Sequence, residues 1–126
     1  AVESRIYNEI KTYRESNGLD GPFVHQYVMV KEAQLYSIKM ASGMQSVDTT
    51  GLQEHWDIIH DKLGGTNHGS LVQETTSEDA TTVVDHWRDL PAADSLLLEN
   101  YTQCGVGVEY GSDGKVYVTV LLMLYE

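Results

Sequence analysis

Residues 105–125 read GVGVEYGSDGKVYVTVLLMLY, and this stretch decides the fold. Residues 105–110 alternate, the GSDG of residues 111–114 is typical of a hairpin loop, and a second strand returns from Lys115. Residues 118–124 are apolar at nearly every position, so both faces of the returning strand need cover, as in a central strand. Gly105 and Gly107 leave one face of the first strand without side chains, so a helix or loop can approach it closely.

The residues upstream of this hairpin show mainly helical periodicity. Apolar residues recur every three or four positions in helices that end near Ser16, Ala41 and Leu63, before Pro91, and at Leu98. Gly18 suits a C-terminal cap, residues 48–50 suit caps for the third helix, and Ser77 suits the N-cap of the fourth. A short strand fits residues 68–72. The pattern predicts one α+β domain over residues 1–126: a three-layer α-β-α sandwich whose small, mostly antiparallel sheet ends in a C-terminal hairpin.

Charge and composition exclude several classes of partner. The 126 residues include 19 acidic and 8 basic side chains, which gives a formal net charge of −11. A field of that sign repels phosphate backbones, so we expect no nucleic-acid partner. No apolar run reaches the length of a membrane span. The opening Ala1-Val2-Glu3 has no signal-peptide character, so we expect either a cytosolic protein or one whose signal segment has been removed.

Cys104 is the single cysteine, so no intrachain disulfide can form. It directly precedes the apolar strand at residues 105–108. A reactive thiol needs an electropositive, partly exposed setting. We therefore predict a buried structural thiol.

Four segments in order resemble the CAP superfamily (cysteine-rich secretory, antigen 5 and pathogenesis-related proteins; SCP-like domains). They are GLDGP at residues 18–22 followed by AQLYSIKMA at 33–41, Trp87 with Pro91 and LLLENYT at 96–102, GVGV at 105–108, and DGKVYVT at 113–119. The likeness covers nearly the whole chain. It implies a secreted or envelope-associated domain.

The resemblance also implies a cleft site that this sequence lacks. CAP domains commonly carry two histidines and two acidic residues able to hold a divalent cation. The matching positions here carry Val47, Ser70 and Ala93, and the fourth has no clear match. Valine and alanine can neither bind a cation nor move a proton. We therefore expect a degenerate site with no catalytic residue, no metal and no cofactor.

The leading hypothesis is thus a non-enzymatic binding or interaction module. Several family members bind sterols or fatty acids between helices, which implies a lipid-like ligand here. Met and Tyr side chains suit an adaptable apolar groove. The candidate groove residues are Tyr36, Met40, Met44, Leu71 and Leu98. The competing interpretation places Tyr36 and Met40 in the core.

Two alternatives remain open. A metal-dependent or hydrolytic site rebuilt from His60, His68 and Glu74 is one, although histidines without a second motif are more often solvated or singly hydrogen-bonded. The other is an adhesion module of a larger surface protein, whose acidic surface suits a basic protein partner.

Overall fold

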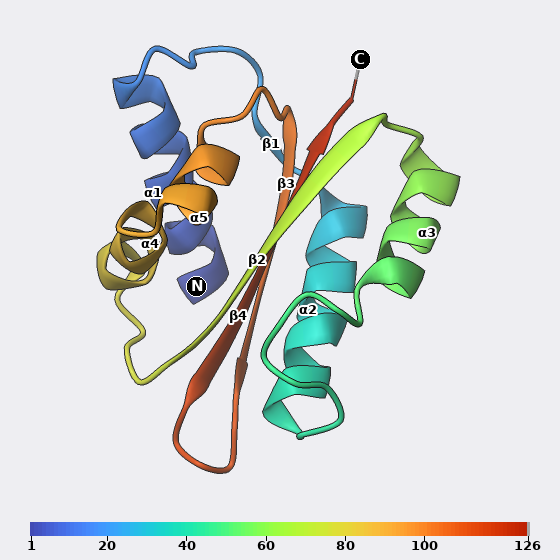
Figure 1. Ribbon diagram of the computed structural model, residues 1–126, viewed down its shortest axis with the longest axis vertical. Coiled ribbons are helices and arrows are strands. Elements are labelled where there is room, and N and C mark those ends of the chain that lie inside the picture. Colours follow the sequence, from blue (N-terminus) through green and yellow to red (C-terminus); the bar gives the residue numbers. More distant parts are fainter. Residues whose placement is uncertain (126) are drawn as a thin grey trace.

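A four-stranded sheet separates two layers of helices in the computed structural model, which describes residues 1–125 (Figure 1). The strands are β1 (Val24–His25), β2 (Asn67–Thr75), β3 (Gln103–Tyr110) and β4 (Val116–Leu124), in the order β1-β3-β4-β2. Only β1 is parallel to its neighbour. The predicted hairpin is confirmed, and β4, which is buried from Val116 to Met123, is internal as its apolar sequence requires.

The helices cover both faces of the sheet, which confirms the predicted α-β-α sandwich. One layer holds α1 (Val2–Ser16), α4 (Ala80–Arg88) and α5 (Pro91–Leu97), and the other holds α2 (Tyr27–Ala41) and α3 (Gln53–Leu63) (Figure 1). Each layer has its own core, because alternate residues of β4 point to opposite faces. Thus Val118 and Val120 pack under α1, α4 and α5, whereas Leu121 and Met123 pack under α2 and α3.

The glycine face of β3 lies directly against α2. A Cβ atom at Gly105 would lie 2.3 Å from the carbonyl carbon of Met29, and one at Gly107 would lie 2.4 Å from that of Ala33. These are backbone atoms, which cannot turn aside as a side chain can. The two glycines therefore set the distance between α2 and the sheet, as their alternation with valine indicates.

The predicted helix ends are correct for α1 and need correction for α3 and α4. Gly18 has φ +82°, and the amide of Leu19 donates to the carbonyl of Arg14, which closes α1 as expected. Asp48 instead accepts the amide of Thr50 within the preceding loop, and α3 begins after Leu52 without a side-chain cap. Asp79, not Ser77, caps α4.

The reason for the shift at α4 is local competition between two side chains. The Asp79 carboxylate accepts the amide of Thr82 at 3.2 Å, while the Ser77 hydroxyl accepts the amide of Asp79 at 3.1 Å. Ser77 thus caps the loop that leads into the helix, and Asp79 caps the helix itself.

Strand β1 escapes the sequence pattern because it has only two residues. His25 lies in β1 and extends the pairing with β3 through its side chain. Its Nε2 accepts the backbone amide of Val106 at 3.3 Å, and its ring stacks on Tyr7 with centroids 4.6 Å apart. An imidazole that accepts at Nε2 must be neutral, with its proton on Nδ1.

Acid is expected to weaken the fold through His25. Burial lowers the pKa of this imidazole, an effect that the nearby Glu3 partly opposes. Below about pH 6.5, the ordinary imidazole pKa, the unfolded chain takes up a proton that the folded domain does not. Stability therefore falls until the pH drops below the lowered folded pKa, and then levels off with respect to this group. Urea midpoints should be measured at about pH 7.5 and at about pH 5.5. The difference between them should be smaller in His25→Gln than in wild type. The same difference in both proteins would contradict the role given to His25.

No helix within residues 1–125 combines the length and the apolar character needed to cross a bilayer.

Candidate functional site

The five predicted groove residues do not share a surface. Tyr36 and Met40 are buried in the core under α2 and α3, whereas Leu71 is buried on the opposite face of the sheet. Met44 is 78% exposed on the loop after α2, and Leu98 lies half-buried at the end of α5. The groove therefore cannot be built from these residues, and Tyr36 and Met40 are core residues, as the competing interpretation holds.

A different apolar groove runs along the outside of the helical layer formed by α2 and α3. Its volume is about 560 Å³, and its walls are Leu35 and Ile38 of α2 and Ile58 of α3, each 40–41% exposed. The remaining lining residues are charged or titratable: Lys31, Glu32, Lys39, Glu54, His55 and Lys62. We call this surface the lysine-rimmed groove. Its size is in the range of small-molecule sites.

A chain of polar contacts crosses from the core to the rim of the lysine-rimmed groove. The Glu32 carboxylate lies 2.9 Å from Nδ1 of His55, and both side chains are 4% exposed. The Lys39 ammonium lies 3.0 Å from Nε2 of His55 and 2.5 Å from the Glu54 carboxylate. Because an ammonium can only donate, Nε2 accepts and Nδ1 carries the proton that is donated to Glu32. The chain thus fixes His55 in one tautomer and holds Lys39 at the rim.

Charge in this groove differs in sign from the rest of the molecule. Three of the chain's five lysines line it, although the protein carries a net charge of −11. Of the two acids, Glu32 is buried against His55. The Lys39 ammonium, through its hydrogen bond and its charge, lowers the pKa of the exposed Glu54 carboxyl. The lysine-rimmed groove is therefore a cationic edge around an apolar wall.

Sequence reasoning missed the Glu32–His55 pair. Glu32 lies among Met29, Ala33 and Tyr36 on the buried stripe of α2. A charged residue on an otherwise apolar helical stripe was the available signal, since a buried carboxylate needs a partner. The identity of that partner depends on how α3 packs against α2, which the sequence does not show.

A second group of titratable side chains lies on the other side of α3, where it faces β2. Nε2 of His60 and Nδ1 of His68 are 2.8 Å apart, and the His68 ring stacks on Trp56 with centroids 4.0 Å apart. The Trp56 indole donates to the hydroxyl of Ser70 at 3.0 Å. We call Trp56, His60, His68 and Ser70 the histidine cluster. Partial burial of the ring, followed by the charge that His60 carries when protonated, lowers the pKa of His68.

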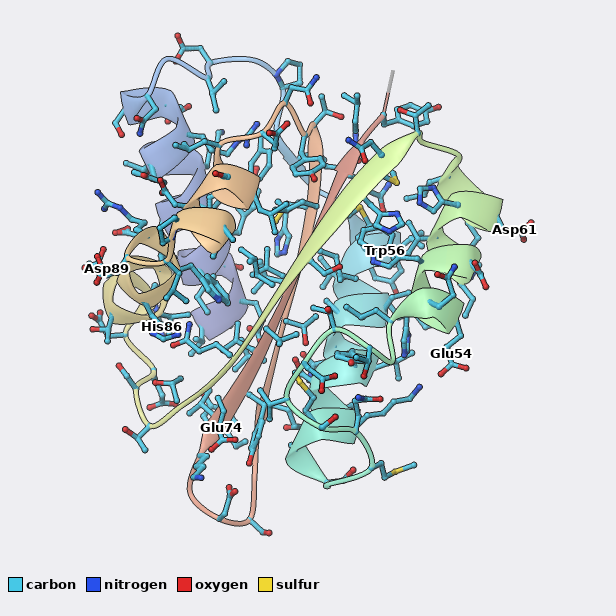
Figure 2. All side chains as sticks on the ribbon, in the orientation of Figure 1. Glu54, Trp56, Asp61, Glu74, His86 and Asp89 are labelled. Carbon is cyan, nitrogen blue, oxygen red and sulfur yellow. The ribbon has the colours of Figure 1, made fainter. Side chains whose placement is uncertain are left out.

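The structure brings His60 and His68 together but leaves Glu74 apart. Glu74 lies toward the opposite end of β2, beside the β3–β4 hairpin, and pairs with the Lys115 ammonium at 2.6 Å (Figure 2). Strand β2 is nine residues long, and its extended backbone carries Glu74 away from His68. Among residues 1–125, no group of three histidine, cysteine or acidic side chains is placed to share a metal ion.

The three positions that match the family's cleft are also dispersed. Val47 is 37% exposed on the loop between α2 and α3, and Ser70 contacts Trp56 on the α3 side of the sheet. Ala93 is buried in the core of the opposite layer. They do not line one cavity. None of the three is an ionisable side chain, so these positions do not fit the divalent cation that the fold family implies.

Cys104 is fully buried, and burial raises the pKa of its thiol, which confirms the prediction of a structural cysteine. His86 is exposed on α4, on the far side of the sheet from Trp56 (Figure 2).

Comparisons with known proteins identify the fold. No protein-family model and no curated protein matches the chain. Several solved structures do, and three of them show the likeness. An outer surface protein of Borrelia burgdorferi has a TM-score of 0.77 at 18% identity, over 95% of this chain and 90% of its own. An extracellular protein of Bacillus anthracis that contains an SCP domain has a TM-score of 0.79 at 19% identity, over 98% of this chain and 40% of its own. A cysteine-rich secretory protein of Staphylococcus aureus has a TM-score of 0.77 at 16% identity, over 98% and 38%.

The chain therefore has an SCP-like fold, as its sequence motifs suggested. It spans about two fifths of the Bacillus and Staphylococcus proteins.

Proposed function

We propose that this SCP-like domain is a non-enzymatic binding module of an extracellular or envelope-associated protein, and that it holds a long-chain carboxylate in the lysine-rimmed groove. The observation that carries the proposal is the groove itself: an apolar wall with three lysines around it on an otherwise acidic protein. The extracellular or outer-surface character of the similar structures supports the location.

The groove matches both ends of such a ligand. An alkyl chain that covers Leu35, Ile38 and Ile58 removes apolar surface from water, worth about 25 cal/mol per Å². The carboxylate would pair with Lys39, whose ammonium His55 already positions. Its present partner Glu54 has a side chain that is 69% exposed, and ion pairs at the surface contribute little to stability, so the ligand can displace it.

The same contacts argue against catalysis in this groove. A general base needs a free nitrogen within reach of the substrate. Nδ1 of His55 is bonded to Glu32, Nε2 is bonded to Lys39, and the side chain is 4% exposed. In the histidine cluster, the acid expected to support a hydrolytic site, Glu74, pairs with Lys115 instead. Binding is therefore the activity that the geometry favours.

Dodecanoate below its micellar concentration is expected to raise the melting temperature of the domain. A ligand that binds only the folded state stabilises it by about 2.7 kcal/mol at a concentration of 100 times Kd. Ile58→Glu places a carboxylate in the wall of the groove and should abolish the shift. Leu90→Glu is the matched control, because Leu90 is 46% exposed on the helical layer across the sheet and should leave the shift intact.

Dodecanol, which lacks the carboxylate, separates the two parts of the proposal. A smaller shift with dodecanol, and a smaller dodecanoate shift in Lys39→Gln, would support recognition of the charge. The proposal fails if dodecanoate gives no shift, or if Ile58→Glu and wild type respond equally.

A further inference from the structure

We propose that His60 and His68 form a two-imidazole site for a late first-row divalent metal ion, with copper(II) bound most tightly. The site does not depend on the lysine-rimmed groove, which lies on the other side of α3. It differs from the suggested His60, His68 and Glu74 triad, because Glu74 takes no part.

His60 is held in the tautomer that a metal ligand needs. Its Nδ1 lies 2.8 Å from the carbonyl oxygen of Gly64. A carbonyl can only accept, so Nδ1 carries the proton and Nε2 presents its lone pair toward His68. A ligating histidine almost always donates its other ring N–H in this way, often to a backbone carbonyl. The Gly64 turn that ends α3 supplies this outer contact.

His68 is held in place by contacts that leave its tautomer free. The ring stacks on Trp56 with an interplanar angle of 6°, and Trp56 is itself 3% exposed and anchored to Ser70. Without metal, Nδ1 of His68 donates to Nε2 of His60. Moving that proton to Nε2 of His68 leaves the ring neutral and frees the lone pair of Nδ1. This lone pair then lies beside that of Nε2 of His60. The ion then binds both lone pairs from a position beside the line that joins the two nitrogens, in place of the hydrogen bond, and no net proton is released.

The separation of the two nitrogens favours one coordination geometry. Nitrogens bound at about 2.0 Å lie about 2.8 Å apart across a right angle at the ion, and about 3.3 Å apart across a tetrahedral angle. The hydrogen-bonded nitrogens are already 2.8 Å apart, so a right angle at the ion needs little change in their separation, whereas a tetrahedral angle needs them to move about 0.5 Å further apart. Right angles belong to the square-planar and tetragonal sites of copper(II) and nickel(II), whereas zinc prefers tetrahedral sites. Copper(II) also stands above nickel(II) in intrinsic affinity.

Water would fill the remaining positions of the ion, because no third histidine, cysteine or acid within residues 1–125 joins the pair. His68 is exposed at the surface, so an ion can enter and leave. The site should therefore bind copper(II) reversibly.

The contact of His68 with Trp56 provides a direct test. Copper(II) held on His68 should quench the emission of Trp56, and titration with copper(II) chloride should saturate at one ion per chain. Either His60→Gln or His68→Gln should weaken binding at least about tenfold, since even loss of an outer-shell partner typically costs that much. His86→Gln, at an exposed histidine across the sheet, is the control and should titrate like wild type.

Trp56→Phe separates the ligand from the reporter. It should still bind one copper(II) ion by calorimetry while losing most of the quenching, because the remaining tryptophan, Trp87, is buried in the opposite layer. Circular dichroism of each variant checks that the fold persists. Equal copper affinity in wild type, His60→Gln and His68→Gln would overturn the proposal, as would quenching that never saturates.

Discussion

Gly107→Ala is expected to cost the domain about 3 kcal/mol, a substantial part of the roughly 5–15 kcal/mol by which a typical domain is stable. The added Cβ would lie 2.4 Å from both the carbonyl carbon of Ala33 and the amide nitrogen of Gln34. Both are backbone atoms of α2, so relief requires the whole helix to move away from β3.

That movement would also break the polar contacts that fasten α2 to the sheet. The Gln34 side chain donates to the carbonyl of Val108 at 2.8 Å and accepts its amide at 3.0 Å. The buried Ser37 hydroxyl lies 3.0 Å from the carbonyl of Gly107 and 2.8 Å from the hydroxyl of Thr119. Groups left without partners in this core cost about 1–3 kcal/mol each.

Urea unfolding followed by circular dichroism measures the effect. Gly21→Ala is the matched control, because a Cβ at Gly21 meets nothing within 4 Å and its φ is not positive. Its midpoint should match that of wild type. If Gly107→Ala and Gly21→Ala have the same urea midpoint, then the glycine face of β3 does not set the distance between α2 and the sheet.

The fold was predictable largely because the hairpin at residues 105–125 is locally unambiguous. Alternating glycines, a polar four-residue loop and a strand apolar on both faces together specify a central hairpin under two helical layers. β1 was not predictable, because a two-residue strand has no period of its own. Its place beside β3 depends on the direction that the chain takes after the turn that follows α1.

The candidate site was much less predictable, because its residues meet only through packing of α2, α3 and β2. The sequence analysis placed His60 and His68 in one candidate site, and the structure brings these two side chains into contact. It also added Glu74, which lies toward the opposite end of the nine-residue strand β2. The groove residues were chosen for their side-chain type, and side-chain type does not reveal which face of a helix is buried.

One helix, α3, contributes residues to both candidate surfaces. His55, Ile58 and Lys62 of α3 recur at i, i+3 and i+7 and face the lysine-rimmed groove, whereas Trp56 and His60 recur at i, i+4 and face β2. The helix has only 11 residues. Its apolar side packs on the core through Trp56 and Ile59. Binding in the groove and binding at the histidine cluster can therefore be disrupted separately by substitutions only two positions apart.

Arg14→Met is expected to destabilise the domain by about 4 kcal/mol. The Arg14 side chain is 4% exposed and donates to the carbonyl oxygens of Leu97, Glu99 and Tyr101 at 2.7, 2.7 and 2.8 Å. Its guanidinium also lies 4.4 Å from the ring centroid of Phe23. Burial lowers the pKa of this guanidinium, so the surrounding carbonyl dipoles must stabilise the charge.

Leu97 is the last residue of α5, and Glu99 and Tyr101 follow the helix. Backbone oxygens at the end of a helix have no partner within it. Methionine preserves much of the apolar packing but donates no hydrogen bond. The loss of stability in Arg14→Met therefore measures the cost of leaving the carbonyls unpaired. Arg14→Lys should recover only part of it, since one ammonium cannot reproduce the planar fork that reaches three oxygens. Arg5→Met, at an exposed arginine of the same helix, should change the urea midpoint little. If Arg14→Met and Arg5→Met have the same urea midpoint, then water satisfies these carbonyls, and the connection from α5 to β3 does not depend on Arg14.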